Sequence, residues 1–80
     1  MIISIKYFGM LAEITQKKEE QIILEESNFS VALLKSKIES TYQDLQKSNY
    51  SIAVNQVMAT TNTILKENDI IAFLPPFAGG

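Results

Sequence analysis

Two glycines, Gly79 and Gly80, close the sequence and are the residues best suited to carry chemistry. Because neither has a Cβ atom, they can pass through a narrow channel and present an unhindered carboxylate to a reagent. Such a carboxylate can form an acyl-adenylate, which a sulfur or an amine can then attack. We interpret the last six residues as an extended tail that the fixed φ angles of two prolines hold away from the domain; the alternative is a frayed chain end. The tail residues are Pro75, Pro76, Phe77, Ala78, Gly79 and Gly80.

The composition excludes most catalytic machinery. The 80 residues include no cysteine and no histidine, so a disulfide, a Cys/His zinc site and a His-assisted nucleophile are all ruled out. The net charge of −2, with lysine as the only basic residue type, disfavours nucleic-acid binding. The longest apolar run, Ile70–Leu74, is too short to span a bilayer, and no leader peptide is recognisable. We expect a single cytoplasmic domain that is not catalytic alone and that itself binds no metal or other cofactor.

Two pairs of adjacent carboxylates are the other candidates for chemistry. They are Glu19 with Glu20 and Glu25 with Glu26. Neighbouring side chains on a strand point to opposite faces, so neither pair converges on one substrate. We interpret both pairs as solvated surface, and Gly9 as a lone glycine rather than part of a phosphate-binding loop.

The first half of the chain predicts two strands and a helix. Residues 1–8 alternate between apolar and polar side chains, as in a strand with one buried face. Residues 9–15 are expected to hold a short helical turn, 16–20 a charged hairpin loop and 21–25 a second strand, antiparallel to the first. A helix is predicted over residues 30–42, with Ser30 as its N-cap. Its core stripe is Val31, Leu34, Ile38, Tyr42 and Leu45.

The second half predicts three more strands. After a loop at 46–50, Ser51–Val54 and Val57–Met58 flank a turn. Residues 60–66 are rich in turn formers, and Ile64 and Leu65 are expected to pin this segment to the core. An asparagine in the left-handed region at position 68 would suit the next turn. Ile70–Leu74 is apolar on both faces and is predicted to be a central strand.

The order of these elements predicts an α+β fold. A hairpin that leads into a helix, followed by a last strand beside the first, is the β-grasp arrangement, a mixed sheet packed on one main helix. A right-handed crossover would make the first and last strands parallel. The predicted organisation is a β-grasp domain over residues 1–74 and an extended diglycine tail over residues 75–80.

The second half of the chain also resembles a known family. Residues 69–80 (DIIAFLPPFAGG) are similar to the C-terminus of MoaD, the small subunit of molybdopterin synthase, and residues 53–56 (AVNQ) match the same MoaD/ThiS family of ubiquitin-like sulfur carriers. The family often has an arginine before the glutamate of the early loop, where this chain has Ala12 before Glu13. The resemblance implies that Gly80 is adenylated and then converted to a thiocarboxylate (1-thioglycine). That group would donate sulfur to cyclic pyranopterin monophosphate, forming the dithiolene of molybdopterin.

The resemblance also implies partners. A MoeB-type ATP-dependent activating enzyme would use ATP and Mg²⁺ to adenylate the tail, and a separate donor would supply the sulfur. The tail would then enter a MoaE-type large subunit in a heterotetramer, the sulfurtransferase complex in which this chain is the sulfur-donating subunit. Because six residues span at most about 20 Å, the large subunit must bind near the root of the tail. We expect Leu74, Met58 and Phe77 to form this interface; the alternative for Leu74 and Met58 is ordinary core.

Two other functions stay open. A ThiS-like carrier of the thiamine pathway shares the fold and the terminal glycines, although it typically lacks the Phe-Leu-Pro-Pro-Phe stretch. A ubiquitin-like protein modifier would use the same activation chemistry and form isopeptide conjugates instead.

Overall fold

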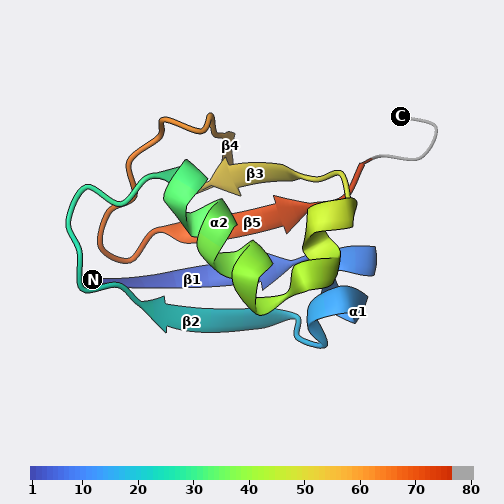
Figure 1. Cartoon of the computed structure of the whole chain (residues 1–80). Helices are drawn as coiled ribbons and strands as arrows, with labels where there is room; N and C mark the ends of the chain where they lie inside the picture. The colour runs from blue at the N-terminus through green and yellow to red at the C-terminus, as the bar shows by residue number, and fades with distance from the viewer. Residues whose placement is uncertain (77–80) are drawn as a thin grey trace.

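A five-stranded mixed sheet forms the centre of the protein in a computed structural model that describes residues 1–76 (Figure 1). Its strand order is β2-β1-β5-β3-β4, and β1 and β5 are parallel while every other neighbouring pair is antiparallel. The predicted β-grasp arrangement is therefore confirmed: the chain forms a hairpin, then a helix, and then a last strand that is parallel to the first. The strands are β1 (Ile2–Tyr7), β2 (Glu19–Ile23), β3 (Ser51–Val54), β4 (Val57–Met58) and β5 (Ile70–Leu74).

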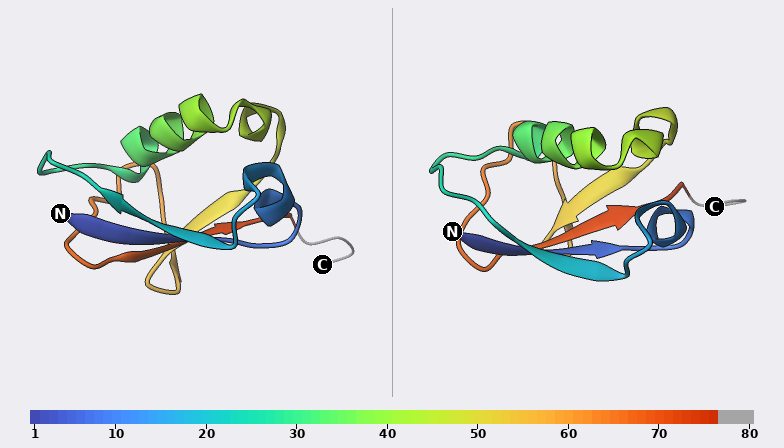
Figure 2. Two further views of the ribbon diagram at one scale, coloured as in Figure 1. Left: turned by 90° about the horizontal axis from the view of Figure 1, so that it is seen from below. Right: turned by 60° about the horizontal axis from the view of Figure 1, so that its bottom comes forward.

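The main helix, α2 (Val31–Thr41), packs across one face of the sheet, and the other face carries no helix among residues 1–76 (Figure 2). The predicted N-cap is confirmed, because Oγ of Ser30 accepts a hydrogen bond from the backbone N–H of Leu33. A short helix, α1 (Met10–Thr15), follows β1, and a 3-10 helix, η1 (Gln43–Lys47), follows α2. The sheet thus has a helix-facing side and an open side.

The core lies between α2 and the sheet. The alternation predicted for the first strand is confirmed, since every second residue of β1 from Ile3 to Tyr7 is at most 3% exposed. The helix stripe is also confirmed, with Tyr42 at its margin as a half-buried side chain. The side chains that are less than 2% exposed are Ile3, Ile5, Leu11, Leu34, Ile38, Leu45, Ile71 and Phe73.

Three local predictions were wrong. The charged loop at 16–20 ends earlier than expected, because Gln16 adopts the left-handed conformation and β2 already begins at Glu19, paired with Lys6. A loop was predicted at 46–50, but its first two residues, Gln46 and Lys47, belong to η1. The fully buried side chain of Leu45 anchors this 3-10 helix. Ile64 is 46% exposed, so Leu65 alone of the predicted pair packs into the core.

The turn between β3 and β4 has two consecutive residues with positive φ. These are Asn55, at φ 51°, and Gln56, at φ 70°, the backbone signature of a type I′ hairpin turn. The side chain of Asn55 closes the turn against β5, because its Nδ2 donates to Asp69 at 2.8 Å and its Oδ1 accepts from the N–H of Ile70 at 2.9 Å. Asn68 has a φ of 68°, which confirms the left-handed asparagine predicted there.

Candidate functional site at the root of the tail

The central strand of the sheet leads directly to the predicted tail. β5 lies between β1 and β3, ends at Leu74 and continues into Pro75 and Pro76 (Figure 1). The predicted reactive residue, Gly80, lies outside the described residues together with Phe77, Ala78 and Gly79. The structure therefore describes the root of the tail, where ladders on both sides hold the chain until residue 74.

Three aromatic rings meet at the last inward-facing position of β5, that of Phe73 itself and two that contact it. Phe73 is fully buried, and its ring stacks on Tyr50 with centroids 5.2 Å apart and planes at 19°. Tyr7, its register partner on β1, meets the same ring edge-on at 5.4 Å and 64°. The N–H of Phe8 donates to the carbonyl of Phe73 at 3.2 Å, so the backbone at this point is fixed as well.

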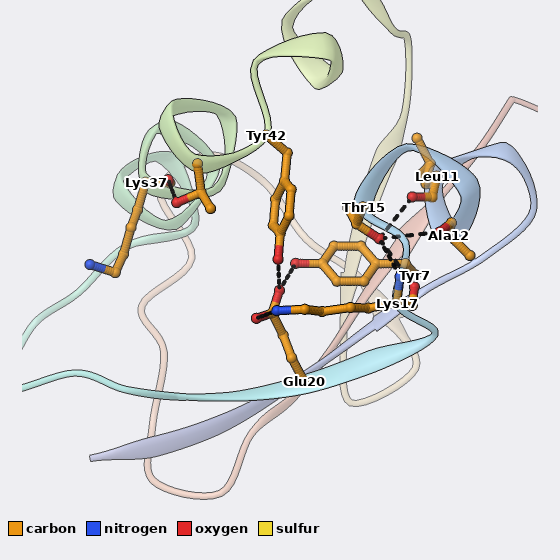
Figure 3. A network of polar contacts seen from close by, with 9 residues as sticks. Tyr7, Leu11, Ala12, Thr15, Lys17, Glu20, Lys37 and Tyr42 are labelled. Atoms are coloured by element: carbon orange, nitrogen blue, oxygen red, sulfur yellow. Dashed lines mark hydrogen bonds and ion pairs between the residues drawn. The ribbon is translucent and has the colours of Figure 1, made fainter.

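A carboxylate from the neighbouring strand anchors two tyrosine hydroxyls at this end of the sheet. Oε2 of Glu20 accepts from the hydroxyl of Tyr7 at 2.6 Å and from that of Tyr42 at 3.0 Å, and Oε1 accepts from Nζ of Lys17 at 3.2 Å (Figure 3). The Glu20 side chain is only 18% exposed. The interpretation of Glu20 as solvated surface was therefore wrong: paired with Ile5 in the ladder, it points to the helix-facing side.

The surroundings of Phe73 shift the pKa values of two phenols, Tyr7 and Tyr50, and of the Glu20 carboxylate. Burial, reinforced by the hydrogen bond to Glu20, raises the pKa of Tyr7 far above its usual range. Burial and the hydrogen bond to Glu39 do the same to the pKa of Tyr50. Partial burial acts to raise the pKa of Glu20, but the hydrogen bonds from Tyr7, Tyr42 and Lys17 outweigh it and leave the pKa below its usual range. The sequence did contain a signal for Glu20, because it stands two residues before Ile22, whose side chain faces the same side of the strand.

A glycine on the loop after β1 lies against the first proline of the tail. Gly9 has φ 56° and ψ −133°, a conformation that L side chains rarely adopt. A Cβ atom built on it would lie 3.1 Å from Cγ of Pro75. The interpretation of Gly9 as a lone glycine with no phosphate-binding role is unchanged, but its position beside the tail was not anticipated.

The predicted interface residues lie on or beside the open face of the sheet. Ile71 and Phe73 are buried under α2, so strand alternation turns Leu74 to the open side, where it is half-buried. Met58 is 60% exposed and is the register partner of Ala53, which is in turn the partner of Ala72 on β5. With one strand between β4 and β5, the backbones that carry Met58 and Leu74 are about 10 Å apart. Two small side chains separate the two residues and leave a low surface between them.

An open hollow of about 460 Å³ lies next to the tail root. Its lining includes Gly9, Ala12 and the half-exposed ring of Phe8, with Lys6 and Lys18 at its margin. Across residues 1–76, no three acidic side chains converge in a way that could hold a metal ion. Within the same residues, no helix is long and apolar enough to cross a membrane.

Comparison with known proteins identifies the family. The model of the ThiS family matches residues 5–80. The chain belongs to the ThiS family. The predicted resemblance to MoaD/ThiS sulfur carriers is thereby confirmed, and so is the ubiquitin-like β-grasp fold that it implied.

Three relatives of this ThiS-family chain can be aligned with nearly all of it. It is 28% identical over 80 residues to the molybdopterin synthase sulfur carrier subunit of Mycobacterium tuberculosis. The aligned region covers 98% of this chain and 96% of that protein. A molybdopterin converting factor subunit 1 of Pyrococcus furiosus shares the fold with a TM-score of 0.89, at 23% identity over 96% of this chain and 99% of that one. A complex of subunits 1 and 2 of the molybdopterin-converting factor of Helicobacter pylori contains a chain that is 26% identical, with a TM-score of 0.71 and full coverage of both.

Proposed function

We propose that this protein is the sulfur carrier subunit of a molybdopterin synthase. The observation that carries the proposal is the path of the central strand: β5 ends at Leu74 and continues into Pro75 and Pro76, and the family match extends through Gly80. The molybdopterin synthase carrier of M. tuberculosis, aligned over nearly the full length of both proteins, supports this function over that of a thiamine-pathway carrier.

In the proposed cycle, the carboxylate of Gly80 attacks the α-phosphate of ATP on an activating enzyme of the MoeB type, releasing pyrophosphate. A donor of sulfide-level sulfur then attacks the acyl carbon, breaks its bond to AMP and leaves a thiocarboxylate. The tail that carries the thiocarboxylate enters the large subunit, and its sulfur forms a C–S bond with cyclic pyranopterin monophosphate. Water then cleaves the acyl–sulfur bond, which restores the carboxylate form for the activating enzyme, and a second loaded carrier supplies the other sulfur of the dithiolene. In this cycle ATP and Mg²⁺ bind the activating enzyme, and the pterin binds the large subunit.

The large subunit would bind the open face of the sheet beside the tail root. The H. pylori complex shows that a related subunit 1 assembles with a subunit 2. Met58 and Leu74 frame the low surface over Ala53 and Ala72, and Phe77 would add a contact from the tail itself. Full burial of one such apolar side chain contributes about 1.5–3 kcal/mol, or roughly tenfold to a hundredfold in affinity.

The test uses two forms of the carrier that differ only at Gly80. One carries a thiocarboxylate, made by thiolysis of an intein fusion, and the other the ordinary carboxylate. Each is mixed with a candidate large subunit and cyclic pyranopterin monophosphate, and molybdopterin is assayed. Product from the thiocarboxylate alone is the expected result, whereas no product with any large subunit from the same organism would refute the proposal.

The native state of the tail provides a second measurement. Intact-mass analysis of the protein from its own cells should show a fraction in which one oxygen is replaced by sulfur. Ladders of isopeptide conjugates without that species would favour the modifier function. Sulfur transfer into the thiazole of thiamine would favour the ThiS-like carrier.

A further inference from the structure

The root of the tail is held by two tyrosines that lie on opposite sides of Phe73. Tyr7 lies on β1 and contacts the Phe73 ring from that strand. Tyr50, the residue immediately before β3, contacts the ring from the other side. Each tyrosine also donates its hydroxyl to a glutamate on a different element, Tyr7 to Glu20 on β2 and Tyr50 to Glu39 on α2. Each tyrosine is therefore fixed at two points: its ring contacts Phe73, and its hydroxyl donates to a glutamate.

Further contacts make this arrangement rigid. Nζ of Lys35 lies 5.3 Å from the centroid of the Tyr50 ring, on the side of α2. Phe73 is 0% exposed and Tyr7 is 3% exposed, so neither ring has room to change rotamer without displacing its neighbours. The residue that follows Phe73 is Leu74, and Pro75 comes next. Phe73 is also the last residue of β5 that pairs with β1, so a side chain that cannot move restricts the backbone at the point where this ladder ends.

The position of the root matters because the reactive group is distant from it. Six residues span at most about 20 Å, so a rotation of about 10° at the root can displace the end of an extended tail by about 3 Å. Displacements of even about 1 Å at a reacting atom can cost as much as a hundredfold in rate. A carrier whose terminus must enter a partner's active site therefore gains rate from a root that is fixed before binding.

We infer that Tyr7 and Tyr50 are positioning residues for the tail: together they clamp Phe73, and Glu20 and Glu39 hold the two rings in place. This inference deepens the proposed sulfur-carrier function and rests on it. The clamp touches no reacting atom. Its effect is on the rate at which the bound tail reaches its productive position, not on the affinity for the large subunit, whose contacts lie on the open face.

Tyr50 offers the sharper test because it is less buried than Tyr7. Tyr50→Leu removes the ring from Phe73, and Tyr50→Phe keeps the ring but removes the hydroxyl. Phe29→Leu is the matched control: Phe29 is also a buried aromatic residue, at 7% exposure, but among residues 1–76 it takes no part in the ring contacts around Phe73. Tyr7→Phe tests the other side of the clamp with a variant that retains the core.

Steady-state sulfur transfer from the thiocarboxylate forms is then measured with the large subunit. Tyr50→Leu should lower kcat about tenfold and leave the KM for the carrier within about twofold, with Tyr50→Phe and Tyr7→Phe in between. Phe29→Leu should change neither constant. Equal losses of kcat in Phe29→Leu and Tyr50→Leu, or a wild-type kcat in Tyr50→Leu, would overturn the inference, as would a change confined to KM.

A second readout uses the free carrier and needs no sulfur chemistry. The N–H of Phe8, which donates to the carbonyl of Phe73, should exchange with solvent about tenfold faster in Tyr50→Leu than in Phe29→Leu. Equal exchange rates would show that Tyr50 does not hold the root. If the wild-type carrier transfers no sulfur, the proposed function fails, and the exchange rates still decide whether the clamp exists.

Discussion

Gly9 and Pro75 approach so closely that a Cβ on the glycine would lie 3.1 Å from Cγ of the proline. The loop after β1 thus bounds the space into which the first tail residue can move. Because Gly9 has φ 56° and ψ −133°, only glycine occupies this position without backbone strain.

Gly9→Ala should lower the free energy of unfolding by about 1–3 kcal/mol, through backbone strain and the contact with Pro75. Urea unfolding measures the loss, and a double-mutant cycle with Pro75→Ala separates the two causes. Strain alone would leave the two substitutions additive, whereas the contact predicts that the double variant is more stable than additivity allows. Unfolding at the wild-type urea midpoint in Gly9→Ala would contradict the observed backbone geometry.

Met58→Asp should weaken binding of the large subunit by at least about tenfold and leave the carrier folded, because the side chain is 60% exposed. Val57→Asp is a matched control on the adjacent residue, which is 68% exposed and points to the other side of β4. Titration calorimetry gives the affinity and circular dichroism reports the fold. Equal affinity in Met58→Asp and wild type would place the partner elsewhere.

Adding one residue after Gly80 should abolish sulfur transfer and leave the melting temperature unchanged, because the proposed reacting group is the carboxylate of that glycine. Gly79→Ala should be nearly as severe, since a methyl group would crowd a narrow channel. Molybdopterin formation and thermal unfolding are measured on the same samples. Normal turnover by the extended chain would exclude the proposed chemistry.

Glu20→Gln should reduce the dependence of stability on pH in acid. The pKa of Glu20 is lower in the folded protein than its ordinary value of 4.5, so the unfolded chain binds more protons as the pH falls. The contribution of Glu20 is therefore complete above pH 4.5 and is lost as the pH falls through the folded-state pKa. Urea unfolding of wild type and Glu20→Gln from neutral pH to about pH 3 checks this. Parallel curves for the two proteins would refute the assignment.

The β3–β4 turn gives a prediction about stability alone. Asn55→Ala removes two hydrogen bonds to β5 and should cost about 1–3 kcal/mol, because Asp69 is 7% exposed and loses a partner. Gln56→Gly should instead stabilise the fold by about 1 kcal/mol, since glycine adopts the φ of 70° without a steric penalty. Chemical denaturation of both variants measures the free energy of unfolding, which should fall in Asn55→Ala and rise in Gln56→Gly. Changes of the same sign would contradict the type I′ geometry.

The regular elements could be predicted from the sequence because their patterns are periodic. The alternation in β1, the spacing of Val31, Leu34 and Ile38 in α2, and the apolar run of β5 each reflect burial on a known face. Their order was then sufficient to predict the parallel contact of β1 with β5. The start of β2 was missed because its first residues are charged, and the pairing partner that extends the strand lies on β1.

The contacts at the tail root could not be predicted in the same way. Glu20 was assigned to solvent from its charge and its neighbour Glu19, whereas its position follows from the three donors that converge on it. Lys17 is only three positions from Glu20, but Tyr7 on β1 and Tyr42 at the C-cap of α2 are 13 and 22 positions away. The same holds for Gly9 and Pro75, which are 66 positions apart and meet only after β5 has inserted beside β1.

The central place of β5 also decides how the molecule bears mechanical load. Tension along the tail is directed down the axis of β5, whose two neighbours hold it by hydrogen bonds that run across that axis. Such a pull shears both ladders at once and cannot peel them one bond at a time, as it could at an edge strand. A partner can therefore grip and release the end of the chain repeatedly while the domain behind it stays folded.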